Sequence, residues 1–129
     1  MLKTLSMVFG IVFLAVGILG FVPGVTNDKD MLLGIFQVGT IHNAVHILSG
    51  LAALIAAKSE DYAQLYFRIF GSVYALVTIV GFVQKDTVLG LFDINMADNW
   101  LHLGLAVAIL GIGFLVPKAP AGPRQSPLI

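Results

Sequence analysis

Residues 9–22, Phe-Gly-Ile-Val-Phe-Leu-Ala-Val-Gly-Ile-Leu-Gly-Phe-Val, return 61 positions later as Phe-Gly-Ser-Val-Tyr-Ala-Leu-Val-Thr-Ile-Val-Gly-Phe-Val at residues 70–83. Eight of these fourteen positions are identical. Residues 30–46 likewise return 56 positions later as residues 86–102, and the residues kept include Asp, Gly, Asn and His. Matching leucines arise readily in apolar sequence, whereas matching polar residues and glycines do not. The sequence therefore predicts a tandem duplication.

The composition places the chain in a lipid environment. Of its 129 residues 58% are hydrophobic and 11% charged, and the mean hydropathy is +0.97, values far from those of a water-soluble domain. Seven basic residues balance seven acidic ones, so there is no basic field to attract nucleic acid. The absence of cysteine excludes disulfides and thiolate metal sites.

Four apolar stretches of 17 to 20 residues follow one another along the chain. At about 1.5 Å per residue, a helix of this length covers about 25 to 30 Å, close to the hydrocarbon thickness of a bilayer. The first stretch is also typical of a secretory signal, but it is long, lacks a small-residue cleavage site and has a counterpart later in the chain. The predicted spans are Leu5–Val22, Val38–Ala57, Tyr66–Val83 and Trp100–Val116.

The expected fold is all-α, a four-transmembrane-helix bundle made by duplication of a helical hairpin, with a short interfacial segment before the second and the fourth span. The transmembrane domain covers residues 1–116, with repeats at 5–57 and 66–116, and residues 117–129 form a proline-rich cytoplasmic tail. Because each repeat holds two spans, both repeats run the same way through the membrane, around a pseudo-twofold axis along its normal.

The basic residues predict that both termini are cytoplasmic. Five of the seven flank the spans on the side of the termini, and two lie on the other side. The five are Lys3, Lys58, Arg68, Lys118 and Arg124, and the two are Lys29 and Lys85.

Glycines repeated between the two copies are expected at helix–helix contacts. Small residues let backbones approach closely in lipid, where no hydrophobic drive joins the helices. Gly10 corresponds to Gly71, and Gly20 corresponds to Gly81. The last span is expected to use small residues in the same way, at Gly104, Ala108 and Gly111.

Each outer segment, residues 30–36 and 86–92, is too short to be a span and too apolar to be an ordinary loop. We expect a brief helix in the headgroup layer, N-capped by Asp30 in one copy and by Asp86 in the other. Cation binding by these carboxylates is the alternative.

Aromatic and basic residues near the span ends are expected to meet the headgroups. Tyr62 and Tyr66 lie near the cytoplasmic boundary and Trp100 near the outer one, as is typical of interfacial anchors. Arg68 aligns with Met7 and is expected to extend towards the cytoplasmic surface.

A polar cluster lies at the outer ends of the second and fourth spans. It reads His-Asn-x-x-His at residues 42–46 and Asp-Asn-x-x-His at residues 98–102. A spacing of four places the first and last residue of each motif on one helical face, and the pseudo-symmetry turns both faces towards the axis. Three imidazoles and one carboxylate then suit zinc, iron or copper, and a haem between two histidines is a further possibility. The candidate metal or haem ligands are His42, His46, Asp98 and His102, with Asn43 and Asn99 as inter-helix polar contacts.

Two other interpretations of the cluster stay open. Polar side chains inside a bundle commonly join helices by hydrogen bonds of on the order of 1 kcal/mol each, which is the favoured interpretation of the paired Asn and His residues. Asp98 also suits the positive start of a helix, with Asn95 as a possible cap. A proton or ion path is the third interpretation.

The paired motifs, each preceded by Leu-Gly-hydrophobic-Phe, resemble a family of small bacterial four-span membrane proteins known only as a domain of unknown function. The resemblance covers residues 5–116 and leaves out the tail. It implies a four-helix fold in the bacterial inner membrane and brings no activity, substrate or ligand with it.

The sequence favours a non-enzymatic membrane protein that serves as an accessory or structural subunit. The alternative is a metal- or haem-binding protein with its site near the extracytoplasmic side. No phosphate loop, nucleophile elbow or helical His-Glu-x-x-His motif points to catalysis. The expected partners are the lipid bilayer and other membrane subunits or a second copy of the chain, and not nucleic acid. The sequence does not identify the process, the partner or the oligomeric state.

Overall fold

The computed structural model describes residues 1–120, and in them the chain is almost entirely helical. The helices are α1 (Leu2–Leu19), α2 (Thr40–Ala56), α3 (Glu60–Gln84) and α4 (Met96–Leu115). Four two-residue strands complete the fold: β1 (Met31–Leu32), β2 (Phe36–Gln37), β3 (Thr87–Val88) and β4 (Phe92–Asp93). The all-α class is as predicted. Most of the predicted tail, residues 121–129, lies outside the described residues.

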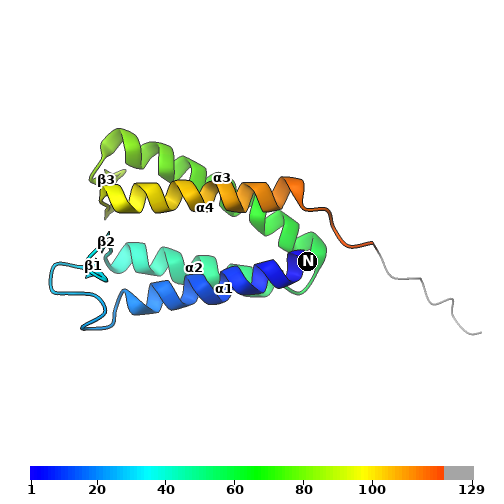
Figure 1. Cartoon of the computed structure of the whole chain (residues 1–129), viewed down its shortest axis with the longest axis horizontal. Coiled ribbons are helices and arrows are strands. Elements are labelled where there is room, and N and C mark those ends of the chain that lie inside the picture. The colour runs from blue at the N-terminus through cyan, green and yellow to red at the C-terminus, as the bar shows by residue number, and fades with distance from the viewer. Residues whose placement is uncertain (121–129) are drawn as a thin grey trace, which may run out of the picture.

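The helices associate as two antiparallel pairs. α1 packs along α2 and α3 packs along α4, and these are the most extensive contacts in the molecule. Figure 1 shows the four helices side by side, with the N-terminus and the end of α4 at one end of the bundle and the strands at the other. The second pair begins at Ser59, whose hydroxyl accepts a hydrogen bond from the Tyr62 amide at 3.0 Å and so caps α3. The pairing of helices follows the duplication found in the sequence.

The segments before α2 and α4 are β-hairpins, and the prediction of brief helices there is wrong. β1 pairs with β2 and β3 pairs with β4, both antiparallel. In the first turn Leu33 and Gly34 both have positive φ, 54° and 69°, and the Ile35 amide donates to the Leu32 carbonyl, as in a type I′ turn. A helix cannot contain two successive residues of this conformation. The second copy repeats these angles within a degree.

Neither aspartate caps a helix. Asp30 itself has φ 56°, outside any N-cap geometry, and its backbone carbonyl accepts from the Val38 amide at 2.8 Å. Asp86 makes the equivalent bond to the Ile94 amide at 3.0 Å. Both residues therefore close the bases of the hairpins, and α2 and α4 begin instead after Gly39 and Asn95.

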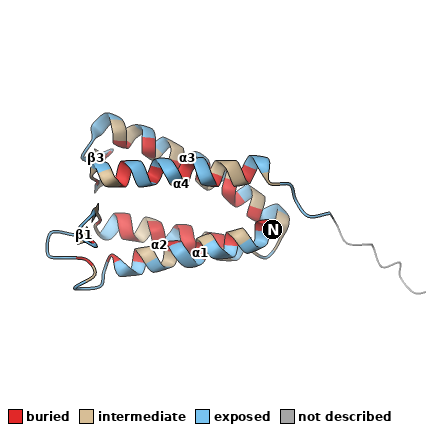
Figure 2. Cartoon of the chain, viewed as in Figure 1, coloured by how far each residue is buried: buried red, intermediate tan, exposed pale blue. Residues whose placement is uncertain are grey.

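The outer faces of the helices are apolar, and the exposed positions in Figure 2 run along them. Three helices, α1, α3 and α4, are long and apolar enough to cross a membrane by length and composition. α2 is apolar too and has 17 residues, a rise of about 25 Å. Buried positions face inward and include both aromatic side chains, such as Phe67, and polar ones, such as His102.

The repeated glycines lie where helices of one pair cross. A Cβ at Gly10 would meet Leu54 Cδ2 at 2.7 Å, and a Cβ at Gly71 would meet the repeat-equivalent Leu110 Cδ2 at 2.9 Å. In the last helix the prediction is wrong, since a Cβ at Gly104 would have no neighbour within 4 Å. The same holds for a Cβ at Gly111, and Ala108 is exposed.

Of the predicted interfacial anchors, Tyr62 and Trp100 are each 61% exposed, whereas Tyr66 is buried. The Tyr66 hydroxyl donates to the backbone carbonyl of Ser49 on α2 at 2.9 Å. Tyr66 therefore joins two helices inside the bundle, because the phenol finds its hydrogen-bond partner there and not at a headgroup.

Replacing Arg68 with the methionine of the equivalent position in the first repeat is expected to destabilise the bundle by about 1–2 kcal/mol. The Arg68 Nε donates to the Gly113 carbonyl in the last turn of α4 at 2.8 Å, and its guanidinium lies 4.7 Å from the centre of the Phe114 ring. Thermal unfolding in detergent followed by circular dichroism measures the loss. Lys118→Met is the control, because Lys118 pairs with Asp61 in an exposed position and should change little. Equal stability of Arg68→Met and the unmodified protein would contradict the role given to this bond.

Candidate metal centre

The two polar motifs lie in the first two turns of α2 and of α4, next to the hairpins. α2 begins at Thr40, which places His42 in its first turn and His46 one turn further on. α4 begins at Met96, so that His102 lies in its second turn. His46 and His102 are equivalent in the two repeats, and the duplication therefore brings them to the same level of the bundle.

The structure brings the three histidines together. One nitrogen from each ring can be chosen so that all three lie within 4.8 Å of one another. The ring centres are 4.6 Å apart for His42 and His46, 5.4 Å for His42 and His102, and 6.2 Å for His46 and His102. We call these three residues the histidine triad.

The triad is buried and its nitrogens lack partners. No member is more than 3% exposed. Within residues 1–120, five of the six ring nitrogens are buried without a hydrogen bond: both nitrogens of His42, both of His46 and Nδ1 of His102. Such groups are rare in folded proteins because each costs about 1–3 kcal/mol in lost solvation. Unpartnered nitrogens clustered in this way indicate a site for a ligand that the nitrogens bind.

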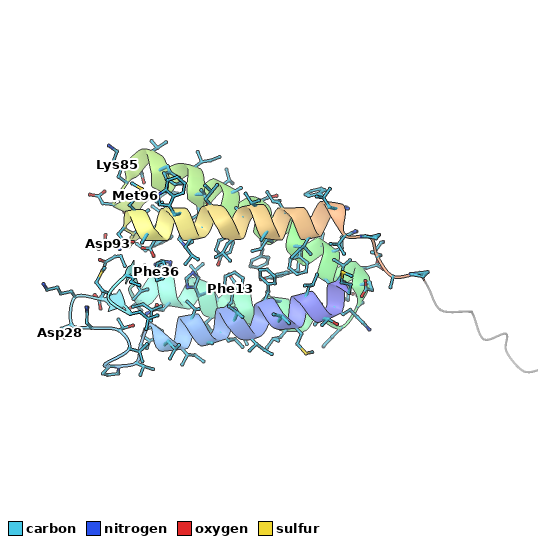
Figure 3. The ribbon with its side chains drawn as sticks, viewed as in Figure 1. Phe13, Asp28, Phe36, Lys85, Asp93 and Met96 are labelled. Carbon is cyan, nitrogen blue, oxygen red and sulfur yellow. The ribbon has the colours of Figure 1, made fainter. Side chains whose placement is uncertain are left out.

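Aromatic rings pack against each member of the triad. Phe92 of β4 covers His42 at 5.2 Å between ring centres, Phe13 of α1 lies 5.9 Å from His46, and Tyr74 of α3 lies 6.0 Å from His102. In Figure 3 Phe13 lies in the space between the two helix pairs. Sequence reasoning missed these three residues, although Phe13 and Tyr74 are equivalent in the repeats and so mark a shared position.

Asp98, the fourth predicted ligand, is engaged elsewhere. Its carboxylate accepts from the Asn95 amide at 3.0 Å, and the Asn95 side chain accepts from the Asp98 amide at 2.9 Å, which together form a capping box at the start of α4. Asp98 is not grouped with the histidine nitrogens, although it is 1% exposed and lies one turn before His102. The capping interpretation of Asn95 is confirmed.

The two asparagines face the repeated glycines. Asn99 donates from Nδ2 to the Gly81 carbonyl of α3 at 3.1 Å and so joins the second helix pair. Asn43 lies against Gly20 in the first pair, where a Cβ would overlap its side-chain amide. The Asn43 side-chain oxygen has no hydrogen-bond partner among the described residues. Within the described part of the chain, Asn99 makes the predicted inter-helix hydrogen bond and Asn43 does not.

The arrangement suits one metal ion better than a haem. Imidazole nitrogens bind zinc and other first-row metals at about 2.0–2.1 Å, and three such ligands form a common set. Rotation of the rings about their side-chain bonds is needed to bring nitrogens that now lie within 4.8 Å of one another to that distance from one ion. A haem would need His46 and His102 on opposite faces of a flat macrocycle, but the His42 ring lies 4.6 Å and 5.4 Å from theirs and fills that space.

The molecule is thus a mainly helical protein whose helices have apolar outer faces, with a buried cluster of three histidines between its two repeats. A family model described as a domain of unknown function (DUF4383) matches residues 3–115, and the chain belongs to that family. Searches of curated proteins and of solved structures found no match. The family agrees with the resemblance to a domain of unknown function and assigns no activity to the triad.

Proposed function

We propose that all four helices cross a bilayer, the bacterial inner membrane, with the hairpins outside and both termini in the cytoplasm. Exposed apolar side chains on every helix support this, because water would not favour such a surface. Lys3, Lys58 and Lys118 lie at the end with the termini, and Figure 3 places Lys85 at the hairpin end. More basic residues towards the termini favour a cytoplasmic location for that end.

Within this bundle we propose that the histidine triad binds one first-row transition-metal ion. The carrying observation is the set of five buried ring nitrogens without hydrogen bonds among the described residues. Helix-joining histidines would hydrogen-bond to a neighbouring helix, as Asn99 does. A metal ion instead accepts the lone pairs of all three rings and offsets the cost of burying them.

The positive charge of the ion requires negative charge near the triad. The triad lies at the N-terminal ends of α2 and α4, where the helix dipoles are positive and disfavour a cation. The buried carboxyl group of Asp98 lies in the first turn of α4 and supplies negative charge there when it is ionised. A nitrogen ligand set of this kind suits zinc, copper, iron or nickel, and not calcium or magnesium.

The proposed role is non-enzymatic, as an accessory subunit that holds the metal for a membrane complex. Catalytic metal sites keep one coordination position open to a substrate or water. Here no histidine is more than 3% exposed and three aromatic rings pack against the triad, so that its ring nitrogens are shielded from bulk water. The apolar outer faces allow lateral contact with other subunits or with a second copy.

Metal analysis of the purified protein tests this function. We expect one equivalent of zinc, copper, iron or nickel per chain in protein purified in detergent, lost on treatment with a chelator and restored by titration with Zn²⁺. Asp98→Asn is the matched control: it keeps the triad, so that one equivalent still binds, although more weakly. If the stripped protein binds none of the four metals stoichiometrically, the proposal is overturned. A Soret band in the spectrum of the purified protein would instead indicate haem binding and would also overturn it.

A further inference from the structure

An apolar cleft of about 320 Å³ opens between α1 and α4 and ends at the triad. Its outer wall includes Val8 and Val12, which are 50% and 52% exposed on the face proposed to meet lipid. Phe9 and Phe13 form the aromatic side, and His46 lies at the inner end. The remaining wall comes from Val16, Leu101 and Leu105.

The equivalent region between α2 and α3 is closed at the level of the triad, and the apolar hollow of about 340 Å³ between these two helices lies further towards the loop that joins them. At the level of the triad the Tyr74 hydroxyl lies 3.1 Å from the Ser49 hydroxyl, and both side chains are buried. Tyr74 is equivalent to Phe13, and Ser49 is equivalent to Leu105. α2 and α3 also approach each other over more of their length than α1 and α4 do. The repeats therefore differ at this pair of positions. A hydrogen bond joins α2 to α3 there, whereas an apolar opening remains between α1 and α4.

His46 gives the cleft one polar function. Both of its nitrogens are buried without a partner among residues 1–120, and the part of His46 that lines the cleft consists of carbon atoms. Turning the ring by 180° about its Cβ–Cγ bond keeps its plane and exchanges its carbon and nitrogen positions. A ring nitrogen then faces the cleft. A neutral imidazole that binds a metal through one nitrogen still donates a hydrogen bond through the other.

We propose that this cleft binds a neutral aromatic molecule with a carbonyl group, of about two fused rings, which enters from the lipid and hydrogen-bonds to His46. A dry cavity of about 150 Å³ holds one benzene ring, so about 320 Å³ suits two. Phe9 and Phe13 provide ring contacts, and the wholly carbon wall favours an uncharged ligand. The proposal rests on the membrane location proposed above and does not need a bound metal.

The test uses the full chain, stripped of metal, in phosphatidylcholine nanodiscs. The probe is 2,3-dimethyl-1,4-naphthoquinone, and the reference compound is 2,3-dimethylnaphthalene, which lacks the carbonyls. We expect a saturable uptake of one quinone per chain above that of empty nanodiscs, and about fivefold weaker uptake of the hydrocarbon, the difference that one hydrogen bond makes. Metal is absent throughout, so failure of the metal site cannot cause a negative result, and incorporation into nanodiscs separately tests the membrane location.

Variants locate the site. Leu105→Trp from α4 and Val12→Trp from α1 fill the cleft from its two walls and are each expected to weaken quinone binding at least about tenfold. Val107→Trp is the matched control, since Val107 is 66% exposed on α4 and does not line the cleft. His46→Phe is expected to abolish the preference for the quinone over the hydrocarbon. Uptake no greater than that of empty nanodiscs, or equal effects of the cleft and control tryptophans, would overturn the proposal.

Discussion

Replacing any one histidine of the triad with phenylalanine is expected to weaken metal binding by about 100-fold or more and, at the same time, to stabilise the metal-free protein. The loss in affinity is large because even an outer hydrogen-bond partner of a metal ligand is worth about 10–100-fold, and a direct ligand is worth more. The gain in stability follows because phenylalanine removes two ring nitrogens that are buried without partners in His42 and in His46. Each such nitrogen costs about 1–3 kcal/mol.

The opposite signs separate a binding site from a structural one. If the triad joined helices by hydrogen bonds, each substitution would lower the melting temperature and leave metal uptake unchanged. Chelator competition with Zn²⁺ measures the affinity, and thermal unfolding of the stripped protein measures the stability. Asn99→Leu is the control, because it removes a hydrogen bond to Gly81 that the structure contains, and it should destabilise without touching the triad. A destabilised metal-free His46→Phe would argue against the site.

The triad was predictable because the duplication constrains where its members lie. A spacing of four aligns His42 with His46 on one helix face, and the repeat places His102 opposite His46. Asp98 has the same spacing to His102, and spacing alone therefore made it a ligand as well. What the spacing could not show is that the Asn95 amide and the carboxylate of Asp98 satisfy each other in a capping box, which engages the acidic group.

The hairpins were missed because their turn residues are unusual. A type I′ turn normally carries Asn-Gly or Asp-Gly, whereas here Leu33 precedes Gly34 and Leu89 precedes Gly90. A leucine with positive φ is strained and is therefore not expected at such a turn position. The local sequence consequently indicated a helix. The backbone hydrogen bonds at the base of each hairpin, accepted by the carbonyls of Asp30 and Asp86, do not depend on side-chain type and so leave no mark in the sequence. The one signal was the glycine repeated in both copies.

Comparison of the two repeats in the sequence contains a signal of the open cleft. Phe13 aligns with Tyr74, and Leu105 aligns with Ser49. Both positions are therefore apolar between α1 and α4, and both carry a hydroxyl group between α3 and α2. Such a paired difference indicates that the two contacts between repeats diverged together. Only the structure shows that Tyr74 and Ser49 meet, because they lie on different helices.

Gly81→Ala and Gly104→Ala, two substitutions of the same kind, are expected to change stability in opposite directions. At Gly81 an added methyl group would overlap the side-chain oxygen of Asn99 and approach Ile94 Cδ1 to 2.9 Å. Asn99 is fully buried and donates to the carbonyl of Gly81 itself, so it cannot move aside without breaking that bond. The expected loss is about 2–4 kcal/mol, from overpacking and the broken hydrogen bond together.

At Gly104 nothing lies within 4 Å of the added methyl group, so the alanine should stabilise α4 by about 0.5–1 kcal/mol through its higher helix propensity. Thermal unfolding of both variants in the same detergent gives the comparison directly. Gly20→Ala extends it to the first repeat, where the methyl group would overlap Asn43, and it should resemble Gly81→Ala. A mild effect at both Gly20 and Gly81 would mean that the helices of each pair can move apart at little cost. The close backbone approach at these glycines would then not be what holds the two asparagines in place, and the geometry of the triad would not depend on it.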